Sequence, residues 1–219
     1  PNWAAYTYIK DSIPENDFTP FVYDFVDYGG EKNWSKMFVS KLLETRSGNC
    51  HSLPYLYKIL CESMGAEAQL ALAPNHLYIM HKDEKGKWSN VELTHGGFPS
   101  DEWIVDQLSI SKESLDSKVF MYPLNQKQSI VMCLYDLVQT YQWRHQDDGF
   151  TRKVLDLALA HHPENILIRM LDANWYANML EQESATSQKN KTRIKIYYRE
   201  YLSRAESLNK LNQTNMIAS

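Results

Sequence analysis

The chain of 219 residues is 43% hydrophobic and 12% aromatic, and it carries a formal net charge of −4 at pH 7. This is enough apolar material for one large domain or two small ones. The acidic balance and the lack of a basic run interleaved with aromatic residues argue against nucleic-acid binding. No segment is long and apolar enough to span a bilayer.

The three cysteines give no disulfide framework, so either redox compartment is left open. The mean hydropathy of −0.50 is typical of a soluble protein. The chain begins at Pro1 without an initiator methionine, so we expect a fragment or a processed form, which is consistent with an extracytoplasmic location.

The first part of the chain predicts helices separated by loops. Residues 1–11 are rich in aromatics and favour a helix or a partly extended segment, and residues 13–20 form a loop. Residues 21–28 fit either a strand or a short helix. Residues 31–44 carry apolar side chains at helical spacing and predict an amphipathic helix that leads into the turn before Cys50.

A cysteine at the start of a predicted helix is the most informative feature of the sequence. Asn49 is a suitable N-cap, which would put Cys50 in the first turn of a helix over residues 50–65. Because Pro54 is tolerated only in a first turn, the alternatives are a helix capped at Ser52, with Cys50 in the turn just before it, or a local irregularity there. The positive end of the helix dipole favours a thiolate, and its N–H groups can hold an oxyanion.

The other two cysteines have a different setting. Cys61 and Cys133 lie on helical apolar stripes, where a free cysteine is most simply a small buried hydrophobe. Cys50 is surrounded by glycine and polar residues instead, which favours a reactive thiol.

Three strands are predicted after this helix, over residues 66–73, 76–82 and 87–94. A three-residue loop with its glycine left-handed would join the last two and pair Asp83 with Lys87. In that register His76 and Glu92 lie on the same face of the sheet and within reach of each other.

A thiol, an imidazole and a carboxylate in this order suit nucleophilic catalysis. The imidazole can take the proton of the thiol, and the carboxylate can orient the imidazole and stabilise its cation. Taken singly, His76 is more simply an edge histidine and Glu92 a solvated strand residue. Together with Cys50, on these elements and in this order, they favour a catalytic triad.

These landmarks resemble the transglutaminase-like core of the papain-like cysteine-enzyme superfamily. Members of that family have a G-x-C opening a helix, a strand that begins with His, and a G-x-W turn before a strand whose acid precedes a Thr. In this chain the matching residues, all within residues 46–94, are Gly48-Asn49-Cys50, His76, Gly86-Lys87-Trp88 and Glu92-Leu93-Thr94. The acid is Glu where the family usually has Asp, and Leu77-Tyr78 replaces a small residue and Trp.

The resemblance implies an α+β core over residues 1–124, in which a helix packs on an antiparallel sheet. It implies a cysteine-dependent acyl-transfer enzyme, either a peptidase, an amidase or a transglutaminase, acting on a peptide or protein amide without a cofactor. Cys50 would be the nucleophile, His76 the base and Glu92 the orienting acid. Because inactive members of such families serve as binding modules, a scaffold that binds a protein or peptide is the alternative function.

Further side chains are candidates for binding the substrate or its oxyanion. Papain-like sites often take an extra oxyanion donor from upstream of the cysteine, and Asn33 and Trp34 are the nearest such residues. Asn49, next to the nucleophile, is a candidate for the same role. His95, in the glycine-rich loop of residues 95–100, is a candidate substrate contact, although an exposed loop histidine is the simpler explanation.

From residue 125 the pattern becomes continuously helical. After a helix or strand at 101–108 and a short helix within 110–123, four helices are predicted over residues 129–146, 151–161, 163–182 and 192–208. A helix ending in HHPEN before another helix resembles the boundary between tetratricopeptide-like repeats. We therefore expect an all-α segment over residues 125–219 that can bind a protein partner.

A metal centre is not predicted. Cys50, His51, His76 and His81 are the nearest set of ligand types, but His81 falls on the opposite strand face from His76. That spacing is poor for one tetrahedral centre. The pair His161-His162 is explained by the favourable position of histidines near a helix C-terminus.

Overall fold

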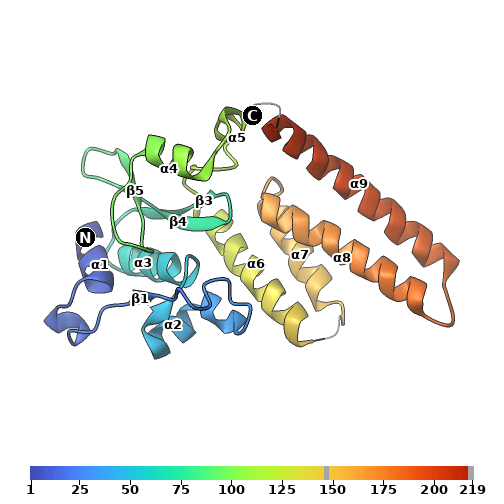
Figure 1. Ribbon diagram of the computed structural model, residues 1–219, viewed down its shortest axis with the longest axis horizontal. Helices are drawn as coiled ribbons and strands as arrows, with labels where there is room; N and C mark the ends of the chain where they lie inside the picture. The colour runs from blue at the N-terminus through green and yellow to red at the C-terminus, as the bar shows by residue number, and fades with distance from the viewer. Residues whose placement is uncertain (146–147, 217–219) are drawn as a thin grey trace. The chain divides into compact units, whose positions relative to one another are not determined.

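The computed structural model describes residues 1–145 and 148–216 (Figure 1). It consists of helices, a three-stranded antiparallel sheet and a helical C-terminal segment, so the predicted α+β class is confirmed. Within this described part of the chain, no helix combines the length and the apolar character that crossing a lipid bilayer requires.

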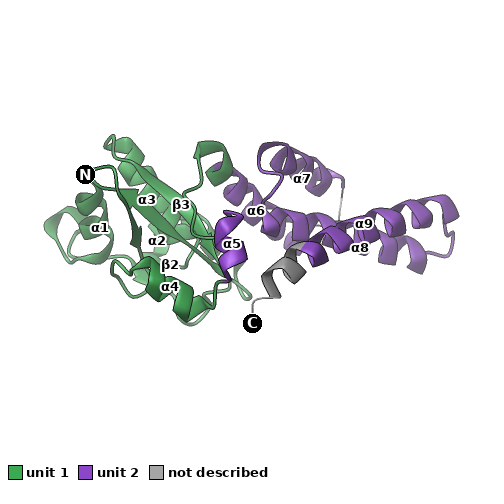
Figure 2. Ribbon diagram, turned by 90° about the horizontal axis from the view of Figure 1, so that it is seen from above, with its two compact units in different colours: residues 1–110, 120–129 green, residues 111–119, 130–219 purple. Residues whose placement is uncertain are grey.

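The chain divides into two compact units, which are coloured separately in Figure 2. Unit 1 consists of Pro1–Ile110 and Phe120–Ser129, and unit 2 consists of Ser111–Val119 and Ile130–Ser219. The expected domains of residues 1–124 and 125–219 stay a prediction.

Unit 1 begins with short elements. In chain order they are α1 (Asn2–Lys10), the 3-10 helix η1 (Pro14–Asn16), β1 (Val22–Tyr23), the 3-10 helix η2 (Trp34–Met37), α2 (Val39–Thr45) and β2 (Ser47–Gly48). The helix expected in the first residues is therefore present, and the segment of residues 21–28 contains a strand. β1 and β2 pair in parallel, with Tyr23 opposite Gly48.

The predicted continuous helix over residues 31–44 is wrong, because Phe38 is extended and divides the segment into η2 and α2. The carboxylate of Asp27 accepts hydrogen bonds from the backbone N–H groups of Lys32 and Asn33, both at 3.1 Å. The side chain of Asn33 then caps η2. These tertiary and capping contacts fix the start of the segment outside a helix and outweigh its helical periodicity.

α3 (Ser52–Ser63) begins at the later of the two predicted starts, and Cys50 lies in the turn just before it. Three strands follow, β3 (Ala68–Ala73), β4 (His76–Lys82) and β5 (Trp88–Val91). They form an antiparallel sheet in the order β3-β4-β5. β5 is shorter than the predicted strand of residues 87–94, and the chain beyond it makes a single bridge between Glu92 and Gly97.

The predicted register of the β4-β5 hairpin is confirmed. The backbone N–H of Asp83 donates to the carbonyl of Lys87 at 2.9 Å, and Ile79 lies opposite Val91. Gly86 has a φ of 79°, a left-handed conformation that glycine adopts without a steric penalty. A slip of one residue would turn every side chain of β5 to the other face, so this turn fixes which residues face the site.

Both faces of the sheet are covered, because α3 and α4 (Asp101–Leu108) lie on its opposite sides (Figure 1). Leu77 and Tyr78, consecutive residues whose side chains leave β4 in opposite directions, are only 1% and 2% exposed. Fully burying a large apolar side chain contributes about 2 kcal/mol. The strand that carries His76 is therefore a firm support for the site.

Unit 2 is helical, as the sequence predicts. Its helices are α5 (Lys112–Asp116), α6 (Gln126–Arg144, whose first turn belongs to unit 1), α7 (Phe150–His161), α8 (Ile166–Ala185) and α9 (Lys191–Met216). α8 begins three residues later than the expected start at Pro163, because the side chain of Asn165 accepts a hydrogen bond from the N–H of Ile168 at 3.0 Å and caps the helix there.

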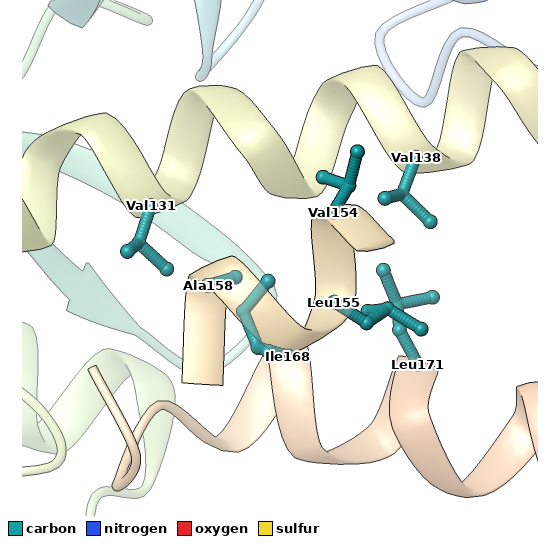
Figure 3. Close-up of a cluster of buried hydrophobic side chains, with 7 residues drawn as sticks. All are labelled: Val131, Val138, Val154, Leu155, Ala158, Ile168 and Leu171. Carbon is teal, nitrogen blue, oxygen red and sulfur yellow. The ribbon is translucent and has the colours of Figure 1, made fainter. Parts of the chain in front are cut away.

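The core of unit 2 is formed by aliphatic side chains of α6, α7 and α8, which point toward one another in Figure 3. Its buried members are Val131, Val138, Val154, Leu155, Ala158, Ile168 and Leu171. Cys133 was expected on the apolar stripe of α6, and this prediction is wrong, because Val131 and Met132 take the buried face and leave Cys133 exposed.

A charged cluster lies beside this core. Asp172 is 5% exposed and its carboxylate is shared by Arg152, at 2.5 Å, and Arg204. The guanidinium groups also lie over aromatic rings, with Arg152 5.1 Å from the centroid of Trp175 and Arg204 4.1 Å from that of Tyr176. The arrangement ties α7, α8 and α9 together.

Candidate active site

The turn that carries Cys50 is held by the side chain of Asn49, which is fully buried. Its amide oxygen accepts hydrogen bonds from the backbone N–H groups of His51, at 3.0 Å, and Ser52, at 3.2 Å. Its amide nitrogen donates to the carbonyl of Tyr28 at 2.9 Å. Asn49 was a candidate for contact with substrate or oxyanion, and its buried, fully engaged amide gives it a positioning role here.

Gly48 explains why a glycine precedes this turn. A Cβ atom at this position would lie 2.5 Å from the hydroxyl oxygen of Ser52 and 2.7 Å from a methyl carbon of Leu42. The Ser52 hydroxyl is needed there, because it accepts a hydrogen bond from the N–H of Asn49 at 3.1 Å. The close packing of β2 against α2 and α3 therefore sets the backbone of the Cys50 turn.

Three groups next to the thiol of Cys50 act on its protonation. They are the ring of His76, the backbone N–H of Leu77 and the hydroxyl of Tyr23. Burial alone would raise the pKa of Cys50, but the hydrogen bond with His76 and the positive charges of His51 and His76 outweigh it and lower that pKa below its ordinary value. The pocket thus favours the thiolate, as does the N-terminus of α3.

His76 is held between the thiol and a carboxylate. Its Nε2 lies 2.6 Å from Oε2 of Glu92, which leaves Nδ1 for Cys50. Burial lowers the pKa of His76, and the hydrogen bonds with Cys50 and Glu92 and the negative charge of Glu92 raise it, with a net result of about 9. At neutral pH the ring is therefore a cation that a thiolate can pair with.

Glu92 is fixed on both of its oxygens. Oε1 accepts a hydrogen bond from the N–H of Thr94 at 2.6 Å, while Oε2 faces His76. Burial raises the pKa of Glu92, but the hydrogen bond and charge of His76 and the hydrogen bond from the N–H of Thr94 lower it to about 2. The backbone N–H of Glu92 donates to the carbonyl of Gly97 at 2.9 Å, so the following loop folds back and anchors the acid.

α1 contacts the segment just after β5 that carries Glu92. The ammonium group of Lys10 donates to the carbonyl of Leu93 at 3.1 Å, next to Glu92. Burial lowers the pKa of Lys10, and the charges of Glu92 and Asp11 partly restore it. This positive group adds to the field that keeps Glu92 ionised.

The remaining predicted contact residues occupy different positions. The side chain of Asn33 caps η2 by accepting from the N–H of Ser35, and Trp34 is the first residue of η2 and is half-buried. The exposed ring of His95 lies 5.5 Å from the ring of Phe25, centroid to centroid. Trp34 and His95 stay predictions as substrate or oxyanion contacts.

Tyr23 was missed by sequence reasoning. The aromatic run of residues 21–28 was visible, but the parallel pairing of two-residue strands that puts Tyr23 opposite Gly48 leaves no signal in composition or periodicity. Burial raises the pKa of Tyr23 and the neighbouring Cys50 raises it further, so its hydroxyl keeps its proton and can donate it to the sulfur.

The other histidines and cysteines have separate surroundings. His81 Nδ1 lies 3.1 Å from the hydroxyl of Tyr57, on the α3 side of the sheet. Cys61 is buried, and burial raises its pKa to about 12. Among residues 1–145 and 148–216, no group of three or more His, Cys, Asp or Glu side chains is arranged to hold a metal ion.

Unit 2 has a cleft of about 500 Å³ lined by Gln142, His145, Thr151, Trp175, Asn178, Met179 and Gln182. Side-chain amides and a tryptophan can bind a peptide chain. The protein partner expected for the C-terminal helices stays a prediction.

Comparison with known proteins gives no family assignment for this chain. No protein-family profile matches it, and no curated protein matches its sequence significantly. Any function assigned to the chain therefore depends on the geometry of the site.

Proposed function

We propose that this chain is a cysteine-dependent acyl-transfer enzyme that acts on a peptide or protein amide through Cys50, His76 and Glu92. The observation that carries the proposal is that the ring of His76 lies between the thiol of Cys50, whose pKa it lowers, and the carboxylate of Glu92, with 2.6 Å between His76 Nε2 and Glu92 Oε2. A structural ion pair would need no half-exposed thiol at its end.

We also propose that unit 1 is a transglutaminase-like core of the papain-like superfamily. The support is the order of the elements: a helix that starts just after Cys50, an antiparallel strand that opens with His76, and the acid just beyond the next strand. The glycine of the G-x-C motif is required here, because there is no room for a side chain at position 48.

The chemistry follows from the roles of the three groups. The thiolate of Cys50 attacks the carbonyl carbon, a C–S bond forms, and the carbonyl electrons move onto oxygen. His76 gives its proton to the amide nitrogen as the C–N bond breaks, which leaves a thioester on Cys50 and releases an amine. Water or a second amine then attacks the thioester and loses its proton to His76, and the thiolate of Cys50 is restored.

The negative charge on the carbonyl oxygen needs donors close to the sulfur. The backbone N–H of Cys50, before the N-terminus of α3, and the hydroxyl of Tyr23 are the candidates. The protonated phenol of Tyr23 already donates to the sulfur in the resting state. The carboxylate of Glu92 keeps the ring of His76 in one orientation and stabilises its cation throughout.

Alkylation by iodoacetamide as a function of pH tests the proposal. The full chain is used with Cys133→Ser, because Cys133 is exposed and would label in parallel, whereas Cys61 is buried. We expect Cys50 to react with a pH midpoint well below that of a free thiol at about 8.5. A midpoint at or above that value would overturn the proposal and favour the binding scaffold.

A peptidyl chloromethyl ketone provides the second measurement. An amide-cleaving site binds the peptide, orients its carbonyl and is alkylated on the nucleophile. We expect saturable labelling that is confined to Cys50 by mass spectrometry and is lost in Cys50→Ala. Labelling spread over all cysteines at rates linear in reagent would contradict an amide-binding site.

A further inference from the structure

The segment Val22–Tyr28 exposes an unusual amount of apolar surface. The exposed fractions of Val22, Phe25, Val26 and Tyr28 are 52%, 61%, 82% and 61%. Single exposed apolar residues are normal on a protein surface, but a cluster of them commonly marks a binding site.

The backbone of the same segment is fixed by hydrogen bonds and ion pairs of its two aspartates. The carboxylate of Asp24 accepts hydrogen bonds from the N–H groups of Val26, at 3.0 Å, and Asp27, at 3.1 Å. Lys36 pairs with both Asp24 and Asp27. The carboxylates are thus turned inward and the apolar side chains outward, which is the reverse of the usual arrangement in a surface loop.

The exposed side chains are continuous with the proposed active site. The ring of Phe25 lies 4.9 Å from that of Tyr23, whose hydroxyl contacts the sulfur of Cys50, and 5.5 Å from the ring of His95. The N–H of Asp24 donates to the carbonyl of Gly48 at 2.7 Å, which ties the segment to the Cys50 turn. Phe25 is therefore separated from the reacting thiol by a single ring.

We propose that Val22–Tyr28, with Phe25 at its centre, binds an aromatic or large aliphatic side chain on the acyl side of the carbonyl that Cys50 attacks. The inference rests on the proposed function and narrows its substrate to peptides that are apolar at this position. An acidic side chain is disfavoured, because the single charge of Lys36 is shared by two carboxylates beneath the segment. An apolar one would cover surface that is otherwise exposed to water.

Two dipeptidyl chloromethyl ketones test the inference, one carrying two phenylalanines and the other two serines. Second-order rates of Cys50 labelling are measured in the full chain with Cys133→Ser, and each is divided by the iodoacetamide rate of the same variant. We expect the diphenylalanine probe to react at least about tenfold faster, a typical discrimination for a hydrophobic subsite.

Substitutions within Val22–Tyr28 test whether this segment causes the preference for the diphenylalanine probe. Phe25→Ala should reduce the ratio between the two probes to about threefold or less, and Val26→Ser should reduce it by a smaller factor. The matched control is Phe18→Ala, which removes an equally exposed phenylalanine, 65% exposed, outside the segment and should leave the ratio unchanged. Far-UV circular dichroism verifies that each variant is folded.

The outcomes separate this inference from the proposed function. A low pH midpoint for iodoacetamide with equal rates for the two probes would overturn the subsite and leave the enzyme proposal standing. A ratio unaffected by Phe25→Ala would also overturn it, as would a dimer that dissociates in Phe25→Ala while the ratio stays unchanged. A pH midpoint for Cys50 like that of a free thiol would overturn both the subsite and the proposed enzyme function.

Discussion

Each of the two units holds a charged side chain between two partners. In unit 2, Asp172 lies between Arg152 and Arg204. In unit 1, His76 lies between Cys50 and Glu92. Both clusters join elements that are distant in sequence, and both are mostly shielded from water. They differ in whether any of their groups can change protonation near neutral pH.

The guanidinium groups of unit 2 cannot do so. Burial lowers the pKa of both Arg152 and Arg204, but the hydrogen bonds and charge of Asp172 raise both above the ordinary arginine value. The cluster is therefore permanently charged and serves packing alone. The cluster of unit 1 ends in a thiol and contains an imidazole, and both groups can gain or lose a proton. Burial of charge by itself is therefore weak evidence of catalysis, and what sets the cluster of unit 1 apart is that two of its groups titrate.

The largest effect should come from breaking the cluster of unit 2. Asp172→Asn leaves two guanidinium groups without their shared carboxylate, and we expect a loss of about 3–5 kcal/mol in the free energy of unfolding. Urea denaturation followed by far-UV circular dichroism measures it. The matched control is Asp156→Asn, which removes an exposed partner of Arg152 and should cost about 1 kcal/mol or less. Equal losses in the two variants would mean that Asp172 is no more than a surface partner.

His76→Ala should have the next largest effect, on reactivity. Without the imidazole, burial raises the pKa of Cys50, and even a free thiol with a pKa of about 8.5 is only about 1% thiolate at about pH 6.5. We expect iodoacetamide labelling of Cys50 to slow roughly 100-fold. In a chain that retains Cys133, the rate at this exposed thiol is an internal standard and should not change. Retention of fast labelling at Cys50 would assign its reactivity to the helix N-terminus alone.

Glu92→Gln removes the negative charge beside His76 and keeps the size and shape of the side chain, so it tests whether that charge matters in the cluster of unit 1. The pKa of His76 should fall from about 9 toward 6.5 and that of Cys50 should rise, so labelling near neutral pH should slow about tenfold. Glu92→Asp is the control, because it keeps the charge and should lose less. A variant as fast as the parent would show that Glu92 does not act through His76.

The same variant has a pH signature in stability. Because the pKa of His76 is raised from 6.5 to about 9, its contribution is full below pH 6.5 and is lost as the pH rises through about 9. Because the pKa of Glu92 is lowered from 4.5 to about 2, its contribution is present above pH 4.5 and is lost as the pH falls toward 2. The stability difference between parent and Glu92→Gln should therefore be greatest between pH 4.5 and 6.5.

Tyr23→Phe should have the smallest effect. It removes one hydrogen bond to the sulfur, worth about 1 kcal/mol, so the pKa of Cys50 should rise slightly and labelling at about pH 6.5 should slow about threefold. Tyr8→Phe, elsewhere in unit 1, is the control and should leave the pH profile unchanged. An identical profile for Tyr23→Phe would remove the phenol from the list of groups that stabilise the thiolate.

Sequence reasoning was most successful where local rules decide the structure. The turn at Gly86 fixes the hairpin register, and this register brings His76 and Glu92 to one place. Prediction from the sequence failed where contacts between residues far apart in the chain determine the local structure. The start of the segment of residues 31–44 is held outside a helix by the carboxylate of Asp27, which accepts hydrogen bonds from the N–H groups of Lys32 and Asn33. The contact of Tyr23 with Cys50 depends on a parallel pairing of very short strands. Neither arrangement has a periodicity that could be read beforehand.

The lack of room at Gly48 has a consequence for how this chain can vary over evolutionary time. Any side chain there would clash with the Ser52 hydroxyl and Leu42. A substitution of Gly48 therefore requires smaller side chains at both of these positions as well. Selection that keeps Cys50 in this turn should therefore conserve Gly48 most strongly, although Gly48 itself takes part in no reaction. Homologues that keep the cysteine should keep this glycine, even where the flanking positions have diverged.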